Sequence, residues 1–79
     1  MRDVASVLER LRAARTDLVV GQPFFGVLAL SVEVRESDAI PTAATDGKEI
    51  LFNSAFVGTI SQEELIGVMA HEVLHCGNG

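Results

Sequence analysis

The sequence predicts an α+β domain in which a small, mainly antiparallel sheet packs against two helices. Three observations favour this class. Apolar residues recur at helical spacing near both ends of the chain, they alternate with other residues in the middle, and Asp46-Gly47 separates two short extended runs. The chain has 79 residues, 48% of them hydrophobic, so we expect one domain over residues 1–79.

The first helix is expected near residues 3–20. Its apolar positions follow helical spacing, with charged residues mostly on the other faces: Val4, Val7, Leu8, Leu11, Ala14 and Leu18. Gly21 tolerates a left-handed backbone and Pro23 cannot continue a helix, so we expect the helix to end there. A partner-binding or membrane-surface helix is the alternative, but the polar face mixes both charges.

A long strand is expected next, over residues 24–35, because apolar residues occupy every second position: Leu28, Leu30, Val32 and Val34. Residues 42–45 and 48–52 then form two short strands. Asp46-Gly47 between them is the two-residue signal of a type I′ hairpin, so turn chemistry accounts for the Asp46 carboxylate. A short helical turn is expected after Asn53.

The last helix has a complete start signal. Ser61 and Glu64 form a predicted capping box, and Ile60 and Leu65 occupy the positions of a hydrophobic staple. Beyond them the helix is apolar round most of its circumference, which is typical of a helix packed on two sides. Polar groups on such a helix need partners, and metal coordination supplies them.

This helix carries the residues His71-Glu72-Val73-Leu74-His75. Residues four apart lie on one face of a helix, so His71 and His75 can bind one metal ion, as in H-E-x-x-H zinc sites. Glu72 lies about 100° round the helix from His71 and can act as general base on a water at that metal. The alternative is two surface histidines that flank a solvated glutamate. Paired imidazoles also accept other late transition ions.

Charge and composition exclude several classes of partner. Eleven acidic and six basic residues give a formal charge of −5, which argues against binding nucleic acid or an anionic membrane. The single cysteine, Cys76, cannot form an internal disulfide, and the start of the chain lacks the apolar segment of a signal peptide. The longest apolar run, residues 24–32, is far short of the roughly 20 residues of a membrane span. We therefore expect a cytoplasmic protein.

Six segments together resemble one known family: Pro23-Phe24-Phe25-Gly26, Leu28-Ala29-Leu30, Thr42-Ala43-Ala44-Thr45-Asp46-Gly47, Phe52-Asn53, Glu63-Glu64-Leu65 and His71-Glu72-Val73-Leu74-His75-Cys76. They are similar to the N-terminal putative metallopeptidase domain of bacterial VWA-like proteins. The resemblance implies a zincin-like subdomain with a backing helix, a sheet whose edge hairpin borders the cleft, and a C-terminal active-site helix. It implies that His71 and His75 bind zinc, and that Glu72 is the general base in hydrolysis of a peptide or protein substrate.

The sequence departs from that family at its end. In similar proteins the chain continues and supplies a third ligand, whereas only four residues follow His75 here. Cys76 is one residue after His75 and so points about 100° away from it, and we expect it to be a small buried hydrophobic residue. We read the chain as truncated after the active-site helix. It also lacks tyrosine as an oxyanion donor.

Two functions follow from this comparison. The first is a zinc metallopeptidase that is a weak zinc binder and a poor enzyme as this fragment. The alternative is a non-enzymatic protein-association module with a degenerate or structural metal site. In either case, exposed apolar surface on the active-site helix is expected to favour a homo-oligomer.

Overall fold

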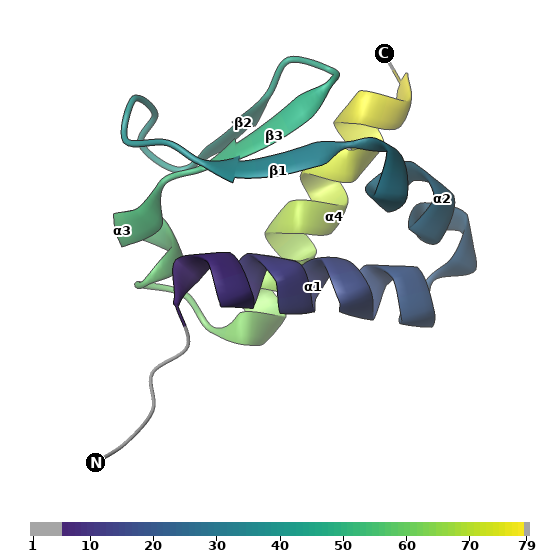
Figure 1. Ribbon diagram of the computed structural model, residues 1–79, viewed down its shortest axis with the longest axis horizontal. Coiled ribbons are helices and arrows are strands. Elements are labelled where there is room, and N and C mark those ends of the chain that lie inside the picture. Colours follow the sequence, from purple (N-terminus) through teal and green to yellow (C-terminus); the bar gives the residue numbers. More distant parts are fainter. Residues whose placement is uncertain (1–5, 79) are drawn as a thin grey trace.

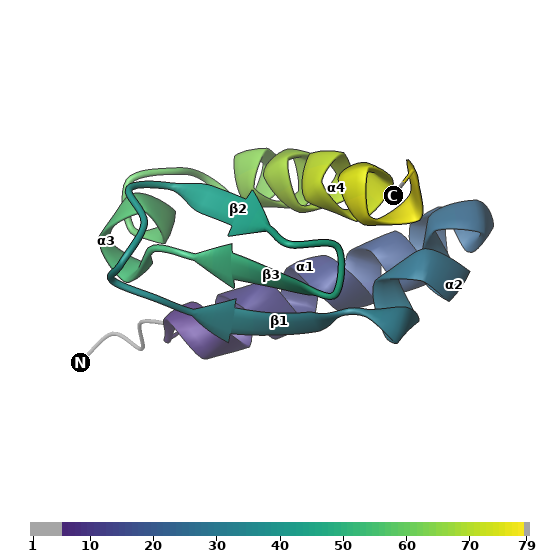
Figure 2. The same cartoon turned by 90° about the horizontal axis from the view of Figure 1, so that it is seen from above.

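A three-stranded sheet and the helices packed against it make up the described part of the protein, residues 6–78 of the computed structural model. The elements follow in this order: α1 (Val7–Gly21), α2 (Pro23–Ser31), β1 (Glu33–Glu36), β2 (Ala43–Thr45), β3 (Glu49–Phe52), α3 (Ser54–Val57) and α4 (Gln62–Asn78). Helices α1 and α4 lie on the same face of the sheet, with α4 next to strand β2 (Figures 1 and 2). The predicted α+β class is confirmed.

The sheet is mixed, with the strand order β1-β3-β2. Strand β1 pairs with β3 in parallel, so that Val34 lies opposite Ile50. Strand β2 pairs with β3 in antiparallel orientation, with Ala44 opposite Leu51. The prediction of a mainly antiparallel sheet is therefore correct for β2 with β3 and wrong for β1 with β3. The edge hairpin was predicted correctly, and its outer strand β2 borders α4.

The predicted long strand over residues 24–35 is wrong for most of its length. Pro23 occupies the first turn of helix α2, where its fixed φ and missing N–H are tolerated, and extended structure begins only at Glu33. In a short uncharged segment, alternating apolar residues are compatible with a strand and with a packed helix. The pattern therefore does not distinguish the two. Although α2 is strongly apolar, no helix within residues 6–78 has both the length and the hydropathy to cross a membrane.

Contacts with α1 stabilise α2 as a helix. The Arg15 side chain donates hydrogen bonds to the carbonyl groups of Ala29, at 2.9 Å, and Val32, at the end of α2. These carbonyls would otherwise lack partners within the helix. Gly26 is buried, and a Cβ atom there would lie 3.2 Å from the carbonyl oxygen of Val19. The contacts of Arg15 span 14 and 17 positions, which local patterns do not reveal.

Helix α1 begins later than predicted. Ser6 is its N-cap, and the Ser6 hydroxyl and Glu9 carboxylate form a capping box. The predicted residues 3–5 lie outside the described residues. The helix ends at Gly21, close to the predicted end, but Pro23 starts α2 rather than a strand. Gly21 has no positive φ; in residues 6–78 only Gly47 does.

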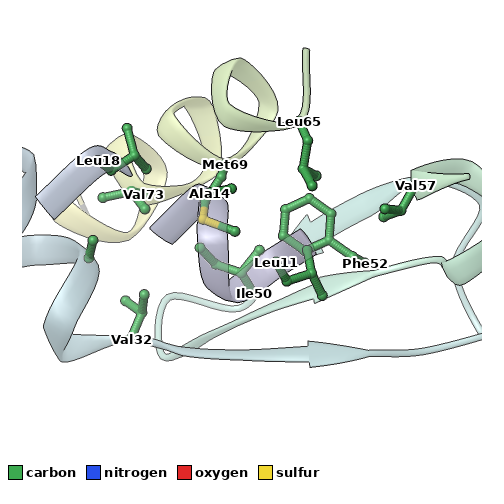
Figure 3. Close-up of a cluster of buried hydrophobic side chains, with 11 residues drawn as sticks. Leu11, Ala14, Leu18, Val32, Ile50, Phe52, Val57, Leu65, Met69 and Val73 are labelled. Atoms are coloured by element: carbon green, nitrogen blue, oxygen red, sulfur yellow. The ribbon is translucent and has the colours of Figure 1, made fainter. Parts of the chain in front are cut away.

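The buried side chains fix the orientation of α4. Figure 3 shows residues from α1, α4 and the sheet gathered around Ile50 and Phe52, and eleven residues form this core: Leu11, Ala14, Leu18, Ala29, Val32, Ile50, Phe52, Val57, Leu65, Met69 and Val73. On α4 the buried residues Leu65, Met69 and Val73 are four apart and so share one face. Residue 71 is two positions from Met69, about 200° round the helix, and therefore points outward.

The N-terminal end of α4 has the predicted capping box. The Ser61 hydroxyl accepts a hydrogen bond from the Glu64 N–H at 3.1 Å, and the Glu64 carboxylate accepts one from the Ser61 N–H at 2.8 Å. Leu65 is buried and Ile60 is half-buried against the core, as the staple requires. The hydrogen bonds from the Ser61 backbone and side chain lower the pKa of Glu64.

Arg10 ties α1 to the segment that leads into α4. Its guanidinium donates to the carbonyl groups of Val57, at 2.7 Å, and Ile60, at 2.8 Å, and to the Gln62 side chain, at 2.9 Å. The Gln62 amide in turn donates to the Arg10 carbonyl at 2.9 Å. The start of α4 is thus held by side-chain hydrogen bonds in addition to its apolar face.

We predict that Arg10→Met lowers the free energy of unfolding by about 2 kcal/mol, because two carbonyl groups and one side-chain amide lose a charged donor. Arg12→Met is the matched control, since Arg12 is exposed on the same helix, and its effect should stay within about 0.5 kcal/mol. Urea denaturation followed by circular dichroism measures both. Equal effects of the two substitutions would contradict the assigned role of Arg10.

The capping box predicts a pH dependence of stability. Because the folded-state pKa of Glu64 lies below its ordinary value of 4.5, the ionised carboxylate contributes stability above that pH. This contribution is lost as the pH falls through the lowered folded-state pKa. We expect the stability difference between the wild-type chain and Glu64→Gln to shrink between pH 6 and pH 3 in urea titrations. A difference that stays constant over this range would exclude the effect.

Candidate functional site

The two histidines of the motif lie on the outward face of α4. His71 and His75 are both exposed, and their Nε2 atoms are 3.1 Å apart. The two rings meet edge to face, with centroids 4.6 Å apart and planes at 82°. The imidazoles therefore converge on one point outside the helix, as their spacing predicts.

The distance between the two rings fits shared coordination of a metal ion. Two nitrogen ligands of tetrahedral zinc, each about 2.0–2.1 Å from the ion, lie about 3.3 Å apart. The observed 3.1 Å is close to this value. The same distance also fits one N–H···N hydrogen bond between neutral rings. The separation thus supports a two-histidine donor pair without identifying its occupant.

Glu72 borders a hollow beside the histidine pair. The hollow has a volume of about 460 Å³. Its lining comes from α4, from the last residue of β2 and from the loop that follows it: Thr45, Asp46, Gly47, Glu72 and His75. Glu72 is half-buried, whereas the imidazole of His75 is exposed. One carboxylate and one imidazole of the motif therefore share a space large enough for water and part of a peptide.

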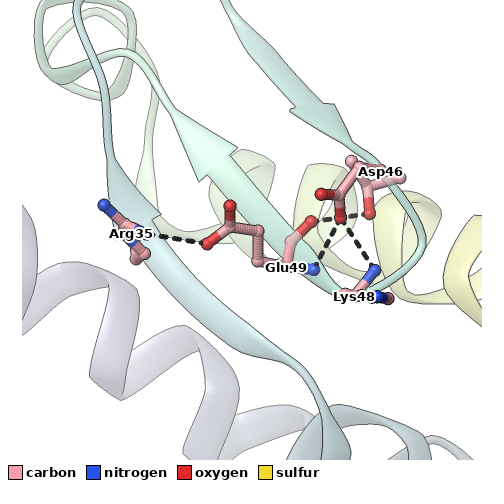
Figure 4. Close-up of polar contacts among 5 residues, drawn as sticks. Arg35, Asp46, Lys48 and Glu49 are labelled. Carbon is pink, nitrogen blue, oxygen red and sulfur yellow. Dashed lines mark hydrogen bonds and ion pairs between the residues drawn. The ribbon is translucent and has the colours of Figure 1, made fainter.

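The hairpin loop forms the second wall of this hollow. The Asp46 carboxylate accepts hydrogen bonds from the backbone N–H groups of Lys48, at 2.8 Å, and Glu49, at 3.0 Å (Figure 4). These two bonds lower the pKa of Asp46, so this carboxylate is ionised in the turn. The predicted role of Asp46 in the turn is confirmed.

The predicted type I′ turn is wrong. That turn needs positive φ at both central residues, but only Gly47, at 94°, has one. The closing pair of the hairpin is Thr45 with Ile50, so four residues separate them: the loop residues 46–48 and Glu49, the first residue of β3. On the sheet beyond the loop, the Glu49 carboxylate pairs with Arg35 on β1 at 3.0 Å (Figure 4). Glu49 is thus engaged away from the histidines.

Cys76 faces the hairpin. Its side chain is half-buried, packs against the core, and places Sγ 3.0 Å from the hydroxyl oxygen of Thr45. The prediction of a small buried hydrophobic residue is therefore correct in part. Sequence reasoning missed Thr45, and the available signal was its place directly before Asp46-Gly47 on the edge strand.

The described residues supply no complete metal centre. Within residues 6–78, no three His, Cys, Asp or Glu side chains lie close enough together to hold a metal ion. The structure therefore brings together the two predicted histidines and the neighbouring Glu72. It does not bring a third protein ligand to them.

Comparison with known families identifies the family of the chain. The sequence model of a family described as "Putative metallopeptidase domain" matches residues 6–78. No curated protein and no solved structure matches the chain. The match covers nearly the whole sequence and includes α4 with its two histidines and Glu72. The chain therefore belongs to the family of putative metallopeptidase domains.

Proposed function

We propose that this domain is a zinc-dependent metallopeptidase of zincin type, with Glu72 as its general base. The observation that carries the proposal is the convergence of His71 and His75, 3.1 Å apart on the outward face of α4. Membership of a metallopeptidase family supports the need for a metal. The position of the antiparallel edge strand β2 beside α4 supports the zincin-like arrangement.

The two histidines would hold the metal through their Nε2 atoms. Bound zinc supplies Lewis acidity, which lowers the pKa of water to about 7 and polarises a peptide carbonyl. Glu72 reaches into the hollow and accepts the proton of the attacking water there. Its carboxyl group then donates that proton to the leaving amine. The loop wall of Thr45, Asp46 and Gly47 limits where a peptide can lie.

The charge of the site supports a peptide as substrate. The hollow contains the carboxylates of Asp46 and Glu72, and neither lysine nor arginine is among its described lining residues. Such a surface attracts a cation and repels phosphate groups. We therefore propose a peptide or protein substrate rather than a nucleic acid, and a cytoplasmic location in keeping with the single free thiol of Cys76.

A non-enzymatic association module is the second candidate function. It is favoured by the lack of a third ligand within residues 6–78 and by exposed apolar side chains. The most exposed of these are Val20, Phe24, Val27 and Leu30, at 66–77%, around helix α2. On α4, Leu74 is 42% exposed. Association of two copies through α4 remains a prediction, and light scattering at high concentration tests it.

We predict that Glu72→Gln keeps metal binding but lowers peptide hydrolysis at least about 100-fold, because the amide cannot accept a proton. Glu63→Gln is the control, since Glu63 is exposed in the first turn of the same helix. Hydrolysis of a quenched fluorescent peptide in the presence of zinc measures the effect. Loss of activity in both variants, or in neither, would count against Glu72 as the base.

We also predict that His71→Ala and His75→Ala each weaken zinc binding by more than about tenfold, the loss seen even for residues that only support ligands. Leu74→Ala lies between them on the same helix and should bind zinc as the wild-type chain does. Isothermal titration calorimetry of the 79-residue chain gives the affinities. If only one histidine matters, the shared site is disproved.

A further inference from the structure

The hydroxyl group of Thr45 lies where the hairpin meets the active-site helix. It donates to the Glu49 carbonyl at 2.7 Å and accepts from the Gly47 N–H at 3.0 Å. Its third neighbour is Sγ of Cys76, also at 3.0 Å. Thr45 is half-buried and lines the hollow together with Glu72 and His75.

Counting protons fixes the direction of the contact between Thr45 and Cys76. A hydroxyl group has one proton to donate and two lone pairs to accept with. The Glu49 carbonyl can only accept, so it takes the Thr45 proton, and the Gly47 N–H uses one lone pair. The remaining lone pair faces Sγ of Cys76, so the thiol is the donor.

We propose that Cys76 and Thr45 are positioning residues, whose hydrogen bond holds the loop of residues 46–48 against α4. Cys76 directly follows His75, and Thr45 directly precedes Asp46, so the bond joins the two walls of the hollow next to their functional side chains. A cysteine bound to a metal is a thiolate and cannot donate this bond. In this proposal Cys76 therefore binds the hairpin through Thr45 and is not a metal ligand.

This inference rests on the proposed peptidase activity for its consequence. Substrate lies between α4 and the loop, so a loop released from α4 no longer sets the width of the hollow. A wall that only holds the substrate binds it equally in the ground state and the transition state, so losing that wall raises KM. We expect the release to raise KM more than it lowers kcat, since Glu72 and the histidines stay on an intact helix.

Cys76→Ala and Cys76→Ser provide the test in the 79-residue chain. Alanine removes the donor to the Thr45 hydroxyl, whereas the serine hydroxyl is a donor at nearly the same position as the thiol. Amide hydrogen exchange by NMR should show Gly47 exchanging about five- to tenfold faster in Cys76→Ala, the effect of one lost hydrogen bond, and near the wild-type rate in Cys76→Ser. Unchanged exchange in Cys76→Ala, or no rescue by serine, overturns the proposal.

Activity gives the second measurement. With zinc and a fluorogenic peptide, kcat/KM should fall about tenfold in Cys76→Ala and in Thr45→Val, mainly through KM, and recover in Cys76→Ser and Thr45→Ser. Thr16→Val, at an exposed site on α1, controls for threonine replacement in general. A lower thermal stability with unchanged KM would make the bond merely structural and refute the positioning role.

The two proposals fail in different ways. If the wild-type chain binds zinc but hydrolyses no peptide, the peptidase function is wrong. Faster Gly47 exchange in Cys76→Ala would then still establish the link between loop and helix, without its catalytic consequence. If the wild-type chain is active and Cys76→Ala matches it in both measurements, only the positioning role is wrong.

Discussion

Burial of one face of α4 is the constraint on which the rest of the structure depends. Leu65, Met69 and Val73 recur every fourth residue and pack against Ile50 and Phe52 of the central strand. Because helix geometry is rigid, this burial also determines what faces outward. Once this face is buried, helix geometry alone makes the imidazoles of His71 and His75 project from the domain. The same helix thus buries one face in the core and turns His71 and His75 outward.

Two arginine side chains supply hydrogen bonds that the apolar core cannot provide. Arg10 and Arg15 both leave α1, and both donate to backbone carbonyl groups at the ends of other segments rather than to carboxylates. The Ala29 carbonyl lies in the last turn of α2 and lacks a partner within that helix, whereas the Ile60 carbonyl lies in the turn before α4. A buried polar group without a partner is costly. Arg10 and Arg15 are half-buried, whereas most of the described acidic side chains are exposed, and two acidic residues line the hollow beside α4.

Local signals predicted α4 and its motif well, because each depends on residues within one or two helical turns. Ser61 and Glu64 define the start of the helix, and the spacing of His71 and His75 defines the site. The helix α2 was missed, since its residues carry no charge and its stability comes from Arg15, eight or more positions earlier. The contact of Cys76 with Thr45 spans 31 positions and has no local signal at all.

The close approach at Gly26 has a consequence for the packing of the first two helices. Even one methyl group at this position would press on the backbone of Val19, and the two helices would have to separate. Such a shift would lengthen the hydrogen bonds between Arg15 and the carbonyl groups of Ala29 and Val32. The junction between the first two helices therefore depends on the absence of a side chain at residue 26.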